Sequence, residues 1–170
     1  MNLYLIRHST AVAVGTAGYA DDSQRPLTEE GSRRMLSIAR GLRAQGTEFD
    51  LILSSPYLRT RQTAAILAEV FVMKDGPVNS VNLRPMGESA QLISEINQKY
   101  KVDKLALVGH EPLLSALISL LVAGNDGLFV SMKAGGVCCL ALDTLRPGRC
   151  ASLEWLMTPV QLARLGEQAE

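Results

Sequence analysis

Residues 3–10 place the tightest constraint on how this chain can fold. The stretch opens with a short apolar run whose residues suit a buried β-strand. The run stops abruptly at Arg7 and His8, two adjacent basic side chains. In open α/β sheets, the ligand crevice lies beyond the carboxyl ends of the parallel strands. The stretch therefore predicts a first strand, over residues 2–6, that delivers Arg7 and His8 to such a crevice.

Strand-like and helix-like segments alternate along the rest of the chain. Further strands are expected over residues 51–53, 78–83, 104–109, 136–142 and 150–155. Helices are expected from the N-cap Thr28 to Gly46 and over residues 57–71, 89–100 and 113–123. This alternation predicts a three-layer α/β/α sandwich with a mostly parallel central sheet. The last two strands are expected to form an antiparallel pair at one side of that sheet.

Length and composition favour a single soluble domain over residues 1–170. The 17 Lys and Arg residues equal the 17 Asp and Glu residues in number, so no overall field attracts nucleic acid or a membrane, and neither is expected as a partner. The longest apolar segment, residues 113–123, is too short to span a bilayer. We expect a cytoplasmic protein whose cysteines, Cys138, Cys139 and Cys150, are reduced and packed.

Side chains able to do chemistry follow three of the predicted strands. The first strand ends in Arg7 and His8, the second runs into Ser54-Ser55-Pro56 and Arg59, and the fourth ends in His110. The chain contains only two histidines, and both fall at such strand ends. Because the carboxyl ends of parallel strands meet at one edge of a sheet, we expect these side chains to line one crevice.

Two guanidinium groups and two imidazoles beside the start of a helix form an anion site. Arginine matches phosphate oxygens with a planar fork of donors, and the first amide groups of the helix over residues 113–123 add partial positive charge. A nearby cation disfavours imidazolium, so Arg7 and Arg59 should keep one histidine neutral and nucleophilic. Two histidines without paired cysteines make a transition-metal site improbable. We therefore expect a phosphoryl site without metal or cofactor.

Three blocks of the sequence carry a resemblance to a known family. They are Arg7-His8-Ser9, the stretch Ser54-Ser55-Pro56-Tyr57-Leu58-Arg59-Thr60-Arg61-Gln62-Thr63-Ala64, and Val108-Gly109-His110-Glu111-Pro112. In this order they resemble the Arg-His-Gly, Ser-Ser-Pro and second-histidine blocks of the histidine phosphatase superfamily, which has a phosphoglycerate mutase-like fold. The chain departs from the first signature by carrying Ser9 in place of glycine.

Other stretches are similar to the short branch of that superfamily, the bacterial protein-phosphohistidine phosphatases. They are residues 25–28 with Gly31, residues 83–88 and residues 155–159. Together with the three blocks, they extend the resemblance over nearly the whole chain. The resemblance makes His8 the nucleophile that forms an N-phosphohistidine intermediate. It also implies that Arg7, Arg59 and His110 hold the phosphoryl oxygens in a metal-independent hydrolase.

The general acid is less narrowly defined by the resemblance. Glu88 occupies an acidic position comparable to that of the short branch, whereas Glu111 mimics the His-Asp pair of acid phosphatases. We favour Glu88, although a phosphoramidate with a protonated imidazole needs little acid assistance. Arg25 is expected to form a salt bridge with Asp21 or Asp22, and Arg61 to point away from the crevice.

The spacing between the blocks bears on the substrate. It leaves room for strands and helices but not for an added helical lid, and small-molecule enzymes benefit from enclosure. We therefore expect a signal-transduction phosphatase that acts on phosphohistidine of a partner protein, such as a histidine-containing phosphotransfer domain. The alternatives are a phosphomonoesterase for a small metabolite and, less favoured, a non-catalytic phosphoprotein-binding module. The sequence leaves the oligomeric state open.

Overall fold

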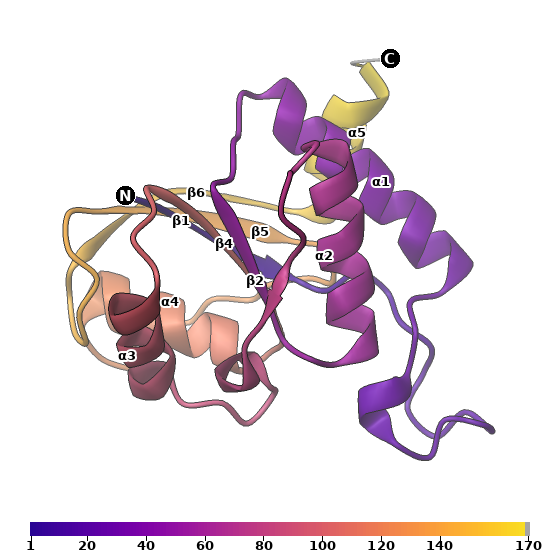
Figure 1. The fold of residues 1–170 in the computed structure, drawn as a ribbon, viewed down its shortest axis with the longest axis horizontal. Coiled ribbons are helices and arrows are strands. Elements are labelled where there is room, and N and C mark those ends of the chain that lie inside the picture. Colours follow the sequence, from indigo (N-terminus) through magenta and orange to yellow (C-terminus); the bar gives the residue numbers. More distant parts are fainter. Residues whose placement is uncertain (169–170) are drawn as a thin grey trace.

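The computed structural model describes residues 1–168 and contains one sheet of six strands in that range. Along the sheet the order is β3-β2-β4-β1-β5-β6 (Figure 1). The first four strands in that order are parallel, and β5 and β6 run antiparallel to their neighbours. The strands are β1 (Asn2–Arg7), β2 (Leu51–Ser54), β3 (Val78–Asn79), β4 (Lys104–Gly109), β5 (Val137–Leu142) and β6 (Ala151–Met157).

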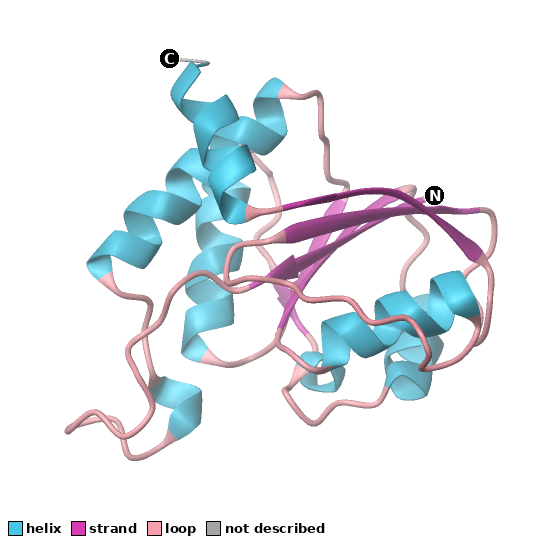
Figure 2. Ribbon diagram, turned by 180° about the vertical axis from the view of Figure 1, so that it is seen from behind, coloured by secondary structure: helices cyan, strands magenta, loops and turns pink. Residues whose placement is uncertain are grey.

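Helices cover both faces of this sheet and complete the three layers (Figures 1 and 2). One face carries α1 (Glu29–Ala44), α2 (Leu58–Val70) and α5 (Pro159–Gln168), and the other carries α3 (Ser89–Lys99) and α4 (Leu113–Ala123). Short 3₁₀ turns lie at η1 (Asp22–Gln24) and η2 (Val81–Leu83). The predicted three-layer sandwich with a mostly parallel sheet is therefore confirmed.

Alternation of side chains along β1 explains how one strand supports two cores. Leu3 and Leu5 are fully buried against the apolar cluster under α3 and α4. Tyr4 and Ile6 belong to the opposite cluster under α1, α2 and α5. Successive strand residues point to opposite faces, so a strand buried on both sides needs a continuous apolar run. For this reason the apolar run before Arg7 predicts a strand that is buried on both faces of the sheet.

The register of the central strands fixes where their carboxyl ends meet. Arg7 of β1 is paired with Gly109 of β4, and Ser54 of β2 is paired with Val108 of β4. The residues that follow these pairs are consequently delivered to one edge of the sheet. The antiparallel β5-β6 pair lies at one side of the sheet, as predicted.

The strand predicted over residues 78–83 is wrong from Ser80 onward. β3 contains only Val78 and Asn79, and the chain then turns into η2. The Ser80 hydroxyl accepts from the amide of Asn82 and also contacts the Glu95 carboxylate at 2.5 Å. The local bond to Asn82 favours a turn over continued strand pairing, the bond to the more distant Glu95 holds this turn against α3, and Leu83 is buried in the core.

The helix α5 was not among the predicted elements. It begins at Pro159, which is preorganised for the first helical position, and it packs on α1. Contact between the two helices is very close: a Cβ on Gly166 would lie 2.0 Å from the carbonyl oxygen of Ser37, and one on Gly41 would lie 2.0 Å from that of Leu162. Glycine is therefore required on both helices for this packing.

Two further expectations concern the cysteines and the membrane. The three cysteines are free, with Cys138 and Cys139 buried in strand β5, as predicted for packed thiols. Over the described part of the chain, every helix is too short or too polar to traverse a lipid bilayer.

Candidate active site

His8, Arg59 and His110 converge at the carboxyl edge of the sheet. His8 follows β1, His110 follows β4, and Arg59 lies in the first turn of α2, just after β2. The two imidazole rings are 5.1 Å apart between centroids. The Nε of Arg59 donates to Nε2 of His8 at 3.2 Å. Three segments that are far apart in the sequence are thus brought together at this edge of the sheet, as the sequence predicted.

Hydrogen bonding defines the tautomer of His8. Its Nδ1 lies 2.7 Å from the carbonyl oxygen of Ser9, and a carbonyl can only accept, so Nδ1 carries the proton. Nε2 then bears the lone pair, in agreement with its role as acceptor from Arg59. Burial lowers the pKa of His8 to about 4, and the charges of Arg59, Arg7 and Arg25 act in the same direction. His8 is therefore a neutral imidazole at physiological pH, with its lone pair on Nε2.

His110 is almost fully buried beside this nitrogen. Its Nε2 lies 2.9 Å from the hydroxyl oxygen of Ser55, which follows β2. Burial lowers the pKa of His110 to about 3, with further contributions from His8 and Arg59. Its Nδ1 is buried and makes no hydrogen bond within residues 1–168. When the Ser55 hydroxyl donates to Nε2, Nδ1 carries a proton available to a bound anion.

Arg7 is held by the loop that precedes β5. Its Nη1 donates to the carbonyl oxygen of Met132 at 2.6 Å, and the amide of Gly135 donates to the carbonyl oxygens of Arg7 and His8. The Nε of Arg7 is buried without a hydrogen-bond partner among the described residues. An unsatisfied buried donor costs about 1–3 kcal/mol. An oxyanion that accepts from Arg7 and His110 would remove that cost.

Arg59 is buried and bound on several sides. Besides the bond to His8, its Nη1 donates to the carbonyl oxygen of Asp22 at 2.7 Å and its Nη2 to the Asp22 carboxylate at 3.0 Å. The guanidinium also lies 4.9 Å from the centre of the Tyr57 ring. The predicted pairing of Arg25 with an acidic neighbour is confirmed, since Arg25 contacts Asp22 at 2.7 Å.

The contact between Asp22 and Arg59 was missed from the sequence. Asp22 lies in a loop without periodicity, 37 positions before its partner, so no local pattern reports the pairing. The sequence showed only that Asp21 and Asp22 lie close to Arg25, and this proximity predicted a pairing with Arg25 and not with Arg59.

Ser9 fits the position where the resembling family carries glycine. Its hydroxyl donates to the carbonyl oxygen of Gly31 at 2.7 Å, and its amide donates to the Thr63 hydroxyl at 3.2 Å. The side chain is fully buried and points to α1. Ser9 therefore anchors the segment that follows His8 to α1 and α2, and its carbonyl remains available to His8.

The two candidate acids occupy different environments. Glu88 is exposed at the N-cap of α3, and its carboxylate accepts from the Gln91 side chain at 2.9 Å. Within the described residues, Glu88 makes no hydrogen bond to His8 or His110. Glu111 directly follows His110, its Oε2 accepts from the Ser115 hydroxyl, and its Oε1 is buried without a partner. The structure therefore brings together His8, Arg59 and His110, with Arg7 next to His8 at the end of β1, and leaves Glu88 outside the hydrogen-bond network of His8 and Arg59.

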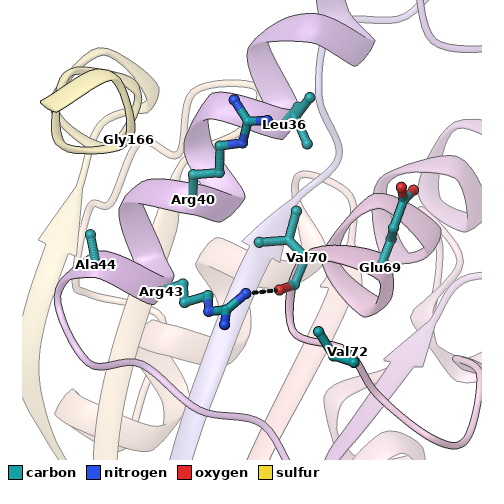
Figure 3. A pocket seen from close by; sticks show the side chains of 8 residues that line it. All are labelled: Leu36, Arg40, Arg43, Ala44, Glu69, Val70, Val72 and Gly166. Atoms are coloured by element: carbon teal, nitrogen blue, oxygen red, sulfur yellow. Dashed lines mark hydrogen bonds between the residues drawn. The ribbon is translucent and has the colours of Figure 1, made fainter. Parts of the chain in front are cut away.

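Arg61 points away from this network, as predicted. It is exposed and lines a separate hollow with Gln62, Pro77 and Asn79. A further groove of about 640 Å³ lies among α1, α2 and α5 (Figure 3). It is lined by Leu36, Arg40, Arg43, Ala44, Glu69, Val70, Val72 and Gly166. No histidine reaches it.

The family assignment follows from comparison with known proteins. The model of the histidine phosphatase superfamily (branch 1) matches residues 3–76, which include Arg7, His8 and Arg59. An uncharacterized protein of Picosynechococcus sp. strain PCC 7002 is 36% identical over 141 residues, covering 81% of this chain and 82% of that protein. The chain belongs to the histidine phosphatase superfamily.

Within this superfamily, the chain is similar to the phosphohistidine phosphatase SixA. SixA of Escherichia coli (strain K12) is 27% identical over 166 residues, which are 95% of this chain and 96% of SixA. The structure of the protein histidine phosphatase SixA complexed with tungstate superposes with a TM-score of 0.77, covering 95% of this chain and 99% of that chain. These relationships support a phosphatase of the short, SixA-like branch.

In the part of the chain that the structure describes, no group of three or more His, Cys, Asp or Glu side chains is arranged to hold a metal ion. The metal independence of this histidine phosphatase remains a prediction.

Proposed function

We propose that this protein removes the phosphoryl group from a phosphohistidine side chain of a partner protein, through a covalent intermediate on His8. The observation that carries the proposal is the fixed tautomer of His8, whose Nε2 lone pair points toward Arg59 in a buried cationic site. Tungstate, the ligand in the SixA structure, is an oxyanion, and the relative's assignment as a phosphohistidine phosphatase supports this substrate class.

The first step transfers the phosphoryl group to His8. Nε2 attacks the phosphorus, the bond to the substrate's imidazole nitrogen breaks, and the electron pair remains on that nitrogen. In the structure, the Nε–H of Arg59 donates to the lone pair of His8 Nε2. When this lone pair attacks phosphorus, the Nε–H would donate to a phosphoryl oxygen instead. Arg7 Nε and His110 Nδ1 would donate to the other oxygens. Such preorganised donors stabilise the charge spread over the oxygens in the transition state.

The second step releases inorganic phosphate. Water attacks the phosphorus, the bond to Nε2 of His8 breaks, and the imidazole returns to its neutral form. A phosphoramidate whose imidazole is protonated leaves without a further acid. No step therefore depends on Glu88 or Glu111, and the role of Glu88 as general acid stays a prediction.

The access to the site supports a protein substrate. Between α2 and α3 the chain forms only β3 and η2, and between α3 and α4 it forms only β4. These connections add no helix over the strand ends. A phosphorylated side chain on a folded protein needs such open access, whereas small metabolites are usually enclosed.

The nucleophile is tested with His8→Ala. We expect this variant to hydrolyse a phosphorylated histidine phosphotransfer protein at least about 10³-fold more slowly, because removal of a nucleophile costs this much or more in other enzymes. The wild-type enzyme, quenched during turnover, should carry acid-labile phosphate on His8. Full turnover by His8→Ala would refute the mechanism.

The substrate class is tested separately by the wild-type enzyme. Its kcat/KM for the phosphorylated phosphotransfer protein should exceed that for each of a panel of sugar phosphates and nucleotides. A clear preference for the esters would replace the substrate class and leave the role of His8 intact.

A further inference from the structure

Asp22 is bound to Arg59, the side chain that donates to His8, although the proposed steps give Asp22 no role. Its carboxylate bridges two arginines, Arg25 at 2.7 Å and Arg59 at 3.0 Å. Its main-chain carbonyl accepts a second bond from Arg59. The 3₁₀ turn that Asp22 begins is thereby attached to the side chain that donates to His8.

The guanidinium of Arg59 can hold Asp22 and a phosphoryl group together. A guanidinium carries five N–H donors, and Asp22 takes one from Nη1 and one from Nη2. The Nε edge faces His8 instead. A phosphoryl group bound between Arg59 and His8 would use that edge, so it need not displace Asp22.

This sharing places a carboxylate close to the transferred group. The Asp22 side chain is partly buried, with 47% of its surface exposed. Partial burial raises the pKa of its carboxyl, but the bonds with Arg25 and Arg59 outweigh this effect and hold the pKa below the usual range. Asp22 is consequently an anion at physiological pH. An anion beside a phosphoryl group repels a phosphate ester but attracts a substrate with a cation next to phosphorus.

A phosphohistidine offers such a cation. When its imidazole is protonated, the ring nitrogen remote from phosphorus carries an N–H and the ring is positively charged. Cleavage of the P–N bond returns the electron pair to the ring, which leaves as neutral imidazole. A nearby carboxylate favours the protonated ring and can accept its N–H. The exposed part of Asp22 faces solvent, from which a substrate ring would arrive.

We infer that Asp22 is a specificity-determining residue, which binds the protonated imidazole of a phosphohistidine substrate and disfavours phosphate esters. The inference rests on the proposed function, because it assumes phosphoryl transfer to His8. The charge of Asp22 would explain why the site prefers phosphohistidine to a phosphate ester, although both substrates donate the same phosphoryl group.

The test is Asp22→Asn, assayed with a phosphohistidine protein and with p-nitrophenyl phosphate. Asparagine keeps the shape and removes the charge. We expect kcat/KM to fall about tenfold for phosphohistidine and to rise several-fold, roughly, for the aryl ester. Asp22→Ser provides a second neutral variant, and circular dichroism verifies the fold of both.

The matched control is Asp21→Asn. Asp21 is the adjacent carboxylate and accepts from the amide of Ser23, whereas Arg59 donates to Asp22. Asparagine also caps such turns, so this variant should leave both kcat/KM values within about twofold of wild type.

The two substrates must respond in opposite directions for the inference to stand. Equal loss with both would mean that Asp22 only positions Arg59, and no change with either would remove it from the site. The failure of the proposed function is distinct, since it would appear as turnover by His8→Ala or as a wild-type preference for esters.

Discussion

The crevice at the strand ends and the groove among α1, α2 and α5 both present arginines, yet they differ in what those arginines can do. In the crevice, Arg59 is 3% exposed and contacts His8, and the Nε of Arg7 is buried without a hydrogen-bond partner in residues 1–168. In the groove, Arg43 is exposed and donates to the carbonyl oxygen of Val70 (Figure 3).

The difference teaches that positive charge and volume do not by themselves define a catalytic site. Exposed arginines are solvated, so a ligand gains little by binding to them. Buried donors that converge on one point interact more strongly because the surroundings are less polar. Three neighbouring strands end at the crevice, whereas the groove is lined by residues of α1, α2 and α5 and by Val72 in the turn after α2.

Among the arginines of the two regions, Arg59→Ala has the largest expected effect. Loss of one preorganised donor lowers kcat by about 10²–10³ in enzymes where it has been measured, and we expect the same range with the phosphohistidine substrate. Arg61→Ala is the matched control, since Arg61 is two positions further along α2 and exposed. Equal losses in the two variants would show that overall charge, not the crevice, drives the rate.

A smaller effect is expected from acid on stability. The pKa values of His8 and His110 are lowered to about 4 and about 3, from 6.5 in an unfolded chain. Between pH 6.5 and these values the unfolded chain binds more protons, so the free energy of unfolding falls as the pH falls. We expect a loss on the order of 2 kcal/mol per histidine between pH 7 and pH 4.5, measured by urea unfolding.

The control for this measurement is His8→Gln with His110→Gln. The chain has only these two histidines, so the double variant should lose most of the pH dependence between pH 4.5 and pH 6.5. An unchanged slope would mean that other groups, and not the crevice, account for the acid sensitivity.

The smallest effect should follow Arg43→Ala, in the groove. Exposed substitutions usually change stability by less than about 0.5 kcal/mol, and no chemistry is assigned there. We expect kcat/KM within about twofold of wild type and a near-identical urea midpoint. A loss of activity comparable to that of Arg59→Ala would end the distinction between the two regions.

The elements with strong local signals were predictable from the sequence. The helix expected over residues 113–123 has those bounds, because Pro112 precedes it and Gly124 adopts the positive φ of 84° that ends it. Strand β4 likewise matches its apolar run. Convergence of His8, Arg59 and His110 followed from the parallel sheet.

What escaped prediction depends on contacts between distant residues. The end of β3 is set by bonds from Ser80 to Glu95, and α5 is set by its packing against α1. The burial of His8 and His110, which lowers their pKa more than the arginines do, is equally a tertiary property. The chemical roles of His8, Arg7, Arg59, His110 and Glu88 stay predictions.

The position of β4 between β1 and β2 has a consequence for how the enzyme is made. His8 and Arg59 are both synthesised early. The strands that precede them, β1 and β2, do not pair with each other, and each pairs with β4. Residues 104–109 must therefore be translated before the two can be held in register. His110 directly follows β4. The site can therefore form only after β4 has been synthesised. The nascent chain therefore lacks the complete site until about two thirds of its residues have been translated.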